Sequence, residues 1–237
     1  MHMKIIAHRG ASFFLPENTL LSIGNALDRG VGMVEIDVRQ SRDGEIVVFH
    51  DATLDRTTNG TGMVKDKTLL ELKKLYAGHG ETIPTLNEVL KLVKSKLGKV
   101  SKFKDQPSII IEIKEPGIEK EVLDIIKQED MVKKVIVASF YHHVSLNLKL
   151  MEEKLKTGII FIAQPIHPEK MALDARAEYM LPFHDYLSEK MVETAHEHDM
   201  MIYTGVVDTL VDMKFVLKMG VDGMVTNRLL GGKSTYK

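Results

Sequence analysis

Short apolar runs alternate with longer amphipathic stretches along the whole chain. Several runs are continuously apolar, such as Ile109-Ile110-Ile111 and Val135-Ile136-Val137, which is typical of strands buried on both faces in a parallel sheet. The pattern predicts eight such strands, over Lys4–His8, Met33–Val38, Ser108–Lys114, Val135–Ser139, Thr157–Ile162, Ala177–Leu181, Met201–Gly205 and Val221–Thr226.

Apolar residues at spacings of three and four predict amphipathic helices between the strands. The five helices that we expect cover Glu17–Arg29, Leu86–Lys96, Ile118–Gln128, Ser188–His198 and Leu210–Met219. Strands that alternate with helices over 237 residues predict an α/β fold, a closed (β/α)8 TIM barrel. We expect residues 1–237 to form one such domain, and a doubly wound open sheet is the alternative.

Residues 39–85 depart from this alternation. Asp43-Gly44 predicts a hairpin turn before a short strand, Glu45–Phe49, and Asn59-Gly60-Thr61-Gly62 predicts a second turn. We interpret this segment as a small inserted loop region between barrel strands two and three, at the mouth of the barrel. Gly231-Gly232 is interpreted as part of a flexible C-terminal tail.

The composition is that of an ordinary soluble protein, with a net charge of −1 and 44% hydrophobic residues. This balance gives no reason to expect nucleic acid as a partner. The lack of cysteine excludes disulfides, thiolate metal sites and a cysteine nucleophile. No apolar run approaches the ~20 residues that span a bilayer, and no signal peptide precedes the first strand. We therefore expect a cytoplasmic protein without membrane insertion; an oligomer is left open.

Charged residues interrupt two of the predicted strands. Glu35 and Asp37 lie two residues apart in one strand, so their carboxylates share a face. Two buried carboxylates repel at a cost of several kcal/mol unless a cation neutralises them, and Mg²⁺ or Ca²⁺ would choose such oxygen ligands. Glu112 and Lys114 repeat the spacing near the end of the next barrel strand, where active sites of barrels form. Glu112 could complete a metal triad and Lys114 could hold a phosphate oxygen, or the two could simply form an ion pair.

Two of the ten histidines end apolar runs on the side where these carboxylates gather. His8 ends the first strand and His50 follows the short strand of the insertion. Histidine has an unperturbed pKa of about 6.5, which suits acid–base chemistry near neutrality. Arg9 beside His8 fits bidentate phosphate binding, and a salt bridge to a carboxylate is the alternative.

A series of short motifs runs in order through the N-terminal half: His8-Arg9-Gly10, Pro16-Glu17-Asn18-Thr19, Glu35-Ile36-Asp37, Asp43-Gly44, His50-Asp51, Arg56-Thr57-Thr58, Ile83-Pro84-Thr85-Leu86 and Glu112-Ile113-Lys114. The series resembles the glycerophosphodiester phosphodiesterases. The second half is compatible with this family, so the resemblance covers Lys4 to about Arg228.

The resemblance implies a barrel that holds a divalent metal ion, Mg²⁺ or Ca²⁺. The matching positions are Glu35, Asp37 and Glu112 for the metal, His8 and His50 for acid–base catalysis, and Arg9 and Lys114 for the phosphate. Two positions depart from the family. Tyr203-Thr204 replaces a common Trp-Thr pair, and we expect Tyr203 to form part of the substrate-binding wall. Asn227 replaces a common aspartate after the last strand.

These observations predict hydrolysis of a glycerophosphodiester, a small-molecule phosphodiester, to glycerol 3-phosphate and an alcohol. One histidine would deprotonate the nucleophile, either the glycerol 2-hydroxyl or a metal-activated water, and the other would protonate the leaving alcohol. The sequence does not assign the two roles. One alternative is a lysophospholipase D or phosphoinositide phospholipase-like activity on acyl-bearing substrates, with Phe13-Phe14-Leu15 as the apolar entry. The other is a non-catalytic phosphate-binding barrel.

Overall fold

Eight parallel strands close into a barrel in the computed structural model, which describes residues 3–97 and 106–229. They are β1 (Lys4–His8), β2 (Met33–Gln40), β4 (Ile109–Ile113), β5 (Val135–Ser139), β6 (Lys156–Phe161), β7 (Tyr179–Pro182), β8 (Met201–Thr204) and β9 (Gly223–Thr226). Because β1 pairs with both β2 and β9, the sheet has no free edge there, and the open-sheet alternative is wrong. The predicted barrel is confirmed.

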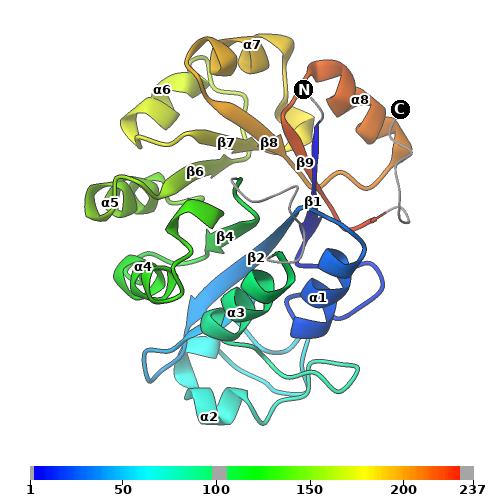
Figure 1. The fold of residues 1–237 in the computed structure, drawn as a ribbon, viewed down its shortest axis with the longest axis vertical. Helices are drawn as coiled ribbons and strands as arrows, with labels where there is room; N and C mark the ends of the chain where they lie inside the picture. The colour runs from blue at the N-terminus through cyan, green and yellow to red at the C-terminus, as the bar shows by residue number, and fades with distance from the viewer. Residues whose placement is uncertain (1–2, 98–105, 230–237) are drawn as a thin grey trace.

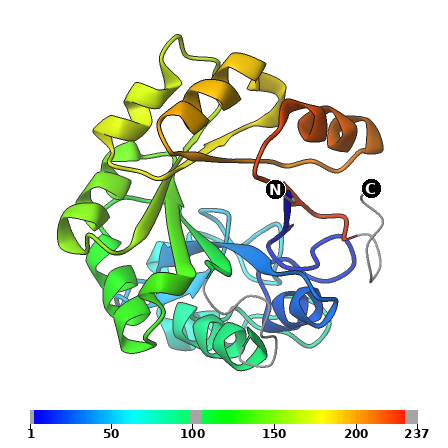
Figure 2. The same cartoon turned by 45° about the horizontal axis from the view of Figure 1, so that its top comes forward.

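Helices cover the outside of the barrel (Figures 1 and 2). They are α1 (Leu20–Asp28), α3 (Leu86–Leu97), α4 (Glu119–Gln128), α5 (His142–Met151), α6 (Pro168–Asp174), α7 (Glu189–Glu197) and α8 (Leu210–Met219). None is long and apolar enough to cross a membrane, among the residues that the structure describes. The predicted Gly231-Gly232 tail lies outside the described residues.

Helix α1 begins three residues later than the sequence pattern predicts. Asn18 has a left-handed backbone conformation, with φ of 58°, and a right-handed α-helix cannot include a residue in this conformation. Thr19 then caps the helix, and its side chain accepts a hydrogen bond from the backbone N–H of Ser22. The residues before the cap are thereby free to point at the barrel mouth.

Helix α5 was not predicted, and its sequence explains why. Its apolar residues Val144, Leu146, Leu148 and Leu150 alternate with polar ones, which is a strand-like period. In the fold Val144 and Leu148 are fully buried, whereas Leu150 is exposed. Packing against the barrel therefore overrides the local pattern. The unpredicted helix α6 is only seven residues long.

The insertion between β2 and β4 extends past the end of β2 (cyan in Figure 1). It contains β3 (Ile46–Val48), which pairs antiparallel with β2, a 3-10 turn (Val64–Asp66) and the short helix α2 (Leu69–Leu72). A small apolar cluster of its own holds it together, formed by Val47, Phe49, Leu54, Val64, Leu72 and Ile83. The predicted decoration of the barrel is therefore a packed structure that can position side chains.

The barrel interior is a packed apolar core. Its buried residues are Ile6, Met33, Ile110, Ile136, Ala138, Ile160, Tyr179, Leu181, Tyr203 and Val225. Gly223 makes room for the largest of them, because a Cβ at this position would lie 2.8 Å from the Tyr203 ring. The interior is therefore filled, and chemistry is confined to its carboxyl end.

Candidate active site

The charged positions of β1, β2 and β4 lie on the inner face of the barrel, one step above the apolar core. Glu35 and Asp37 follow Met33 at intervals of two, and Glu112 follows Ile110 in the same way. The strand register pairs His8 with Glu35, and Asp37 with Glu112. Alternation along each strand and register between strands together gather these side chains at the carboxyl end of the barrel.

The three carboxylates form a compact oxygen cluster. One oxygen each of Glu35, Asp37 and Glu112 lies within 4.8 Å of the others. Asp37 is 1% exposed, and its Oδ1 accepts no hydrogen bond from the described residues. A buried oxygen without a donor, beside two more carboxylates, fits a hard divalent cation.

Burial sets the protonation of this cluster. It raises the pKa of Glu35 well above its usual value and that of Glu112 to about 7, and the nearby Asp37 charge adds to both shifts. Burial would also raise the pKa of Asp37, but Arg9 and Lys114 outweigh it and hold this pKa below its usual value. Negative charge therefore concentrates on Asp37, and the two glutamates need further positive charge to ionise fully.

A left-handed turn after β1 brings Arg9 into the cluster. The φ angles of Arg9 and Gly10 are 55° and 82°, and a Cβ on Gly10 would lie 2.5 Å from Ser22 Oγ, so only glycine fits there. The turn lets the Arg9 backbone N–H donate to Glu35 Oε2 at 3.1 Å. The guanidinium Nε lies 3.0 Å from Asp37 Oδ2. The predicted salt bridge of Arg9 is thus present.

Lys114 supplies the second positive charge. Its Nζ lies 2.5 Å from Glu112 Oε1 and 3.5 Å from Asp37 Oδ1. It also lies 5.8 Å from the ring centre of Phe140. The ion pair between Glu112 and Lys114, which the sequence offers as the alternative interpretation, is therefore present. The cation remains 13% exposed at the mouth, where it can meet a second anion.

His8 is held through one ring nitrogen, and the other faces a carboxylate. Its Nδ1 lies 2.8 Å from Asn227 Oδ1, and its Nε2 lies 3.9 Å from Glu35 Oε2. Burial and the positive charge of Arg9 lower the pKa of His8. The ring is therefore neutral at physiological pH, with one edge turned to the carboxylates.

His50 belongs to a chain of ionic contacts between the insertion and the β1–α1 loop. Its Nδ1 lies 2.5 Å from Asp51 Oδ1, and Arg56 Nε lies 2.6 Å from Asp51 Oδ2. Arg56 also donates to both oxygens of Glu17, which in turn accepts from Arg9. Burial lowers the pKa of His50, although the Asp37 charge and the hydrogen bond to Asp51 oppose the shift. The chain thus links His50 to the turn that carries His8.

Comparisons with known proteins match this fold and site to one family. The model of the glycerophosphoryl diester phosphodiesterase family matches residues 8–230. The chain belongs to that family. The glycerophosphodiester phosphodiesterase of Caldanaerobacter subterraneus is 38% identical, over 96% of this chain and 95% of the relative, and that of Bacillus altitudinis is 34% identical over 94% of each.

A solved structure of a related protein has the same fold as this chain. A phosphodiesterase of Oleispira antarctica, in complex with the product sn-glycerol-3-phosphate, has a TM-score of 0.85 and 26% identity, over 94% of this chain and 92% of that one. The chain is accordingly an enzyme of the phosphoric diester hydrolase class, as the sequence motifs predict. Neither sequence-based alternative, an acyl-specific phospholipase or a non-catalytic barrel, is favoured by these relatives.

Seven of the eight residues that the sequence selects for the glycerophosphodiesterase site come together: His8, Arg9, Glu35, Asp37, His50, Glu112 and Lys114. Tyr203 does not join them. Its side chain is fully buried in the barrel interior, where its ring centre lies 5.1 Å from that of Tyr179. A side chain with no exposed surface cannot form a substrate-binding wall in this conformation.

Several residues that support the site received no role from the sequence. Asn18 donates from Nδ2 to Asp37 Oδ2 at 2.9 Å and accepts from the Asp37 backbone N–H at 3.3 Å. Glu17, Asp51 and Arg56 form the ionic chain described above. All four lie in the motifs that carry the family resemblance, so the signal was present but did not say which contact each makes.

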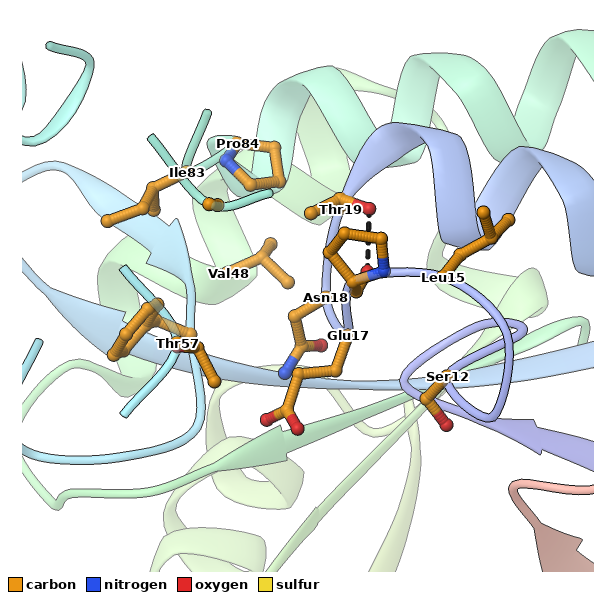
Figure 3. Close-up of a pocket in the computed structure, with 12 residues that line it drawn as sticks. Ser12, Leu15, Glu17, Asn18, Thr19, Val48, Thr57, Ile83 and Pro84 are labelled. Atoms are coloured by element: carbon orange, nitrogen blue, oxygen red, sulfur yellow. Dashed lines mark hydrogen bonds between the residues drawn. The ribbon is translucent and has the colours of Figure 1, made fainter. Parts of the chain in front are cut away.

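A pocket of about 300 Å³ adjoins the site between the β1–α1 loop and the insertion (Figure 3). Its lining is Ser12, Leu15, Pro16, Glu17, Asn18, Thr19, Val48, Phe49, Thr57, Ala77, Ile83 and Pro84. None of the seven gathered residues lines it. Glu17 and Asn18 separate the two regions, because they line the pocket and also hold Arg9 and Asp37. The seven gathered residues therefore lie beside this pocket and outside it.

Proposed function

We propose that this chain hydrolyses glycerophosphodiesters to glycerol 3-phosphate and an alcohol, with a divalent metal ion and with His8 and His50 as the proton-transfer pair. The single observation that carries the proposal is the placement of two histidines beside a cluster of three carboxylates, two of them buried, and two cations at the carboxyl end of the barrel. The Oleispira antarctica relative, which is in complex with sn-glycerol-3-phosphate, supports the choice of product.

Glu35, Asp37 and Glu112 would hold the metal ion. Their all-oxygen donor set, with an Asp37 Oδ1 that accepts no hydrogen bond from the described residues, fits Mg²⁺ or Ca²⁺. When bound, the ion supplies positive charge that polarises the phosphoryl group and neutralises charge developing on its oxygens.

The remaining groups of the chain bind the phosphate and move protons. Arg9 and Lys114 lie on the two sides of Asp37, so both can contribute positive charge to a phosphodiester bound over the cluster. One histidine takes the proton of the nucleophile, either the glycerol 2-hydroxyl or water, and the other gives a proton to the leaving alcohol oxygen. Because both Nδ1 atoms are already paired, Nε2 is the reactive nitrogen on each ring.

A substrate screen tests this proposal. The purified protein, supplied with Mg²⁺ or Ca²⁺, is incubated with glycerophosphocholine, glycerophosphoethanolamine and glycerophosphoinositol, and glycerol 3-phosphate release is measured. Lysophosphatidylcholine is assayed beside them, because Phe13 and Phe14 are about half exposed near the mouth and could meet an acyl chain. We expect the deacylated substrates to be turned over faster. A clear preference for lysophosphatidylcholine would overturn the proposed substrate class, and no turnover of any diester would overturn the proposal.

A further inference from the structure

The side-chain amide of Asn227 ties the loop after β9 to His8. Its Oδ1 lies 2.8 Å from His8 Nδ1 and accepts a second hydrogen bond from Ser12 Oγ at 2.7 Å. Strands β9 and β1 are neighbours in the barrel, so this contact joins residues that are 219 positions apart in the chain. Asn227 is thus the polar partner on the ring edge that faces away from the carboxylates.

Asp208 determines which way this amide points. Asn227 Nδ2 donates to Asp208 Oδ2 at 2.6 Å, and the Asn227 backbone N–H donates to Asp208 Oδ1 at 2.8 Å. Thr226 Oγ1 adds a third hydrogen bond to Asp208 Oδ1 at 3.0 Å. These bonds outweigh burial and hold the pKa of Asp208 below its usual value. An ionised carboxylate only accepts hydrogen bonds, so the NH2 group must face it and the amide oxygen must face His8.

The amide orientation in turn fixes the tautomer of His8. An amide oxygen cannot donate a hydrogen bond, so the hydrogen between the two groups belongs to His8 Nδ1. The neutral ring therefore carries its lone pair on Nε2, the nitrogen that lies 3.9 Å from Glu35 Oε2. A ring in this state can accept a proton from a substrate but has none to give there.

His50 is oriented differently. Its Nδ1 is paired directly with the carboxylate of Asp51, which Arg56 holds. A carboxylate stabilises the charged imidazolium of its partner, whereas an amide oxygen does so much less. Both histidines are thus held through Nδ1, but the partner of His8 is a neutral amide and that of His50 is a carboxylate.

We propose that Asp208 is a positioning residue that acts through Asn227 to hold His8 in its Nδ1–H tautomer, with Nε2 unprotonated and facing the Glu35 carboxylate. The inference rests on the proposed function of His8. It also gives a role to Asn227, whose amide stands between the negative charge of Asp208 and the His8 ring.

The tautomer can be observed directly by NMR. Metal-free protein with ¹⁵N-labelled histidine is studied at about pH 8, and the His8 signals are identified by their loss in His8→Gln. We expect the wild-type ring to show a protonated Nδ1 and an unprotonated Nε2. Asn227→Ala and Asp208→Asn should each move the signals toward the Nε2–H form or toward a mixture. A wild-type His8 protonated on Nε2, or signals unchanged in both variants, would overturn the inference.

Kinetics of the metal-loaded enzyme give a second test. We expect Asn227→Ala to lower kcat by roughly 10–100-fold and Asp208→Asn by about tenfold, each with KM changed less than about twofold, as for loss of an orienting partner. Asp212→Asn is the matched control. It makes the same chemical change four residues away, where the carboxylate bonds Thr209 and not Asn227, and should leave kcat unchanged.

Exchange of the two side chains separates positioning from a merely structural role. Asn227→Asp alone would place two carboxylates face to face and should lower kcat, because they repel. The double variant Asp208→Asn/Asn227→Asp restores one carboxylate and one amide in hydrogen-bonding contact, so we expect kcat within a few-fold of wild type. A double variant no better than the worse single variant would overturn the inference. Full activity of His8→Gln would instead refute the proposed function, on which the NMR result does not depend.

Discussion

The two halves of the barrel use the same interior positions for different purposes. On β1, β2 and β4 the inward side chains near the carboxyl ends are charged or titratable. On β5 to β9 the inward side chains are apolar or small; Ala138, which pairs with Glu112 in the register, is one example. The first half therefore carries the charged groups that we propose for the chemistry, and the second half supplies a wall and much of the buried core.

This difference shows how the barrel tolerates a group of buried charges. Glu35 and Asp37 of the first half each have partners from outside their own strand. Asp37 is held by Asn18 and Arg9 from the β1–α1 loop, and His50 by Asp51 within the insertion. The loops thus provide the polar partners that strands alone would lack, at a site that burial makes costly. Four predictions test the contrast, from the largest expected effect to the smallest.

Removal of the metal ion should abolish the activity that we propose for the charged half of the barrel. After treatment with EDTA and dialysis we expect no detectable turnover of glycerophosphodiesters, and recovery when Mg²⁺ or Ca²⁺ is restored. Added metal should also raise the Tm of the metal-free protein, because the ion binds the folded carboxylate cluster and not the unfolded chain. In Glu112→Gln the rise in Tm should be much smaller. Full activity after thorough chelation would contradict an essential metal ion.

Loss of either histidine of the proposed proton-transfer pair should be the next largest effect. We expect His8→Gln and His50→Gln each to lower kcat by about 10²–10⁴, the usual contribution of general acid–base catalysis. His143→Gln is the control, since His143 is exposed on α5 in the second half of the barrel. Measurement of kcat and KM with saturating metal separates loss of chemistry from loss of binding. If both variants kept nearly wild-type turnover, the two-histidine mechanism would be wrong.

Ionisation of Glu112 should lower the free energy of unfolding of the metal-free protein. The folded protein keeps this group protonated up to a pKa of about 7, whereas the usual value is 4.5. Between these values folding takes up a proton, so Glu112 removes stability as the pH rises from about 4.5 to 7, and the loss persists above pH 7. Glu112→Gln should therefore be more stable than wild type by about 1–3 kcal/mol at pH 8, and by much less near pH 5.

Urea unfolding of both metal-free proteins at the two pH values measures this difference. Saturating metal should reduce it at pH 8, because the ion stabilises the ionised carboxylate of the wild type. An advantage of Glu112→Gln that did not grow between pH 5 and pH 8 would contradict the assigned cause.

The smallest effect is expected in the apolar half, at Tyr203. Its hydroxyl is buried near that of Tyr179 and makes no hydrogen bond of good geometry among the described residues, so Tyr203→Phe removes a poorly satisfied polar group. We expect unchanged kcat and KM, and a free energy of unfolding that is equal or up to about 1 kcal/mol higher. A fall in kcat/KM with no loss of stability would instead support the substrate-binding role that the family resemblance predicts for this residue.

Much of the fold and the site could be predicted from the sequence, for identifiable reasons. The buried strands can be recognised in the sequence as apolar runs. Their observed bounds differ from the predicted ones by no more than two residues. Glu35, Asp37 and Glu112 stand out because a charge inside such a run is costly without a partner. Helix α5 could not be predicted in this way, because its residues alternate like a strand and only packing against β5 and β6 selects the helix.

The sequence by itself determined which side chains face the barrel interior, because alternation along a strand is a local property of the backbone. Only the tertiary structure decided which of them meet. The register of separate strands placed Glu35 beside His8 and Asp37 beside Glu112. Closure of the barrel brought Asn227, near the C-terminus, to the imidazole of His8, near the N-terminus. It also placed Tyr203 inside the core and set Asp208 behind Asn227. Such contacts depend on long-range packing of the whole barrel, which no local pattern encodes.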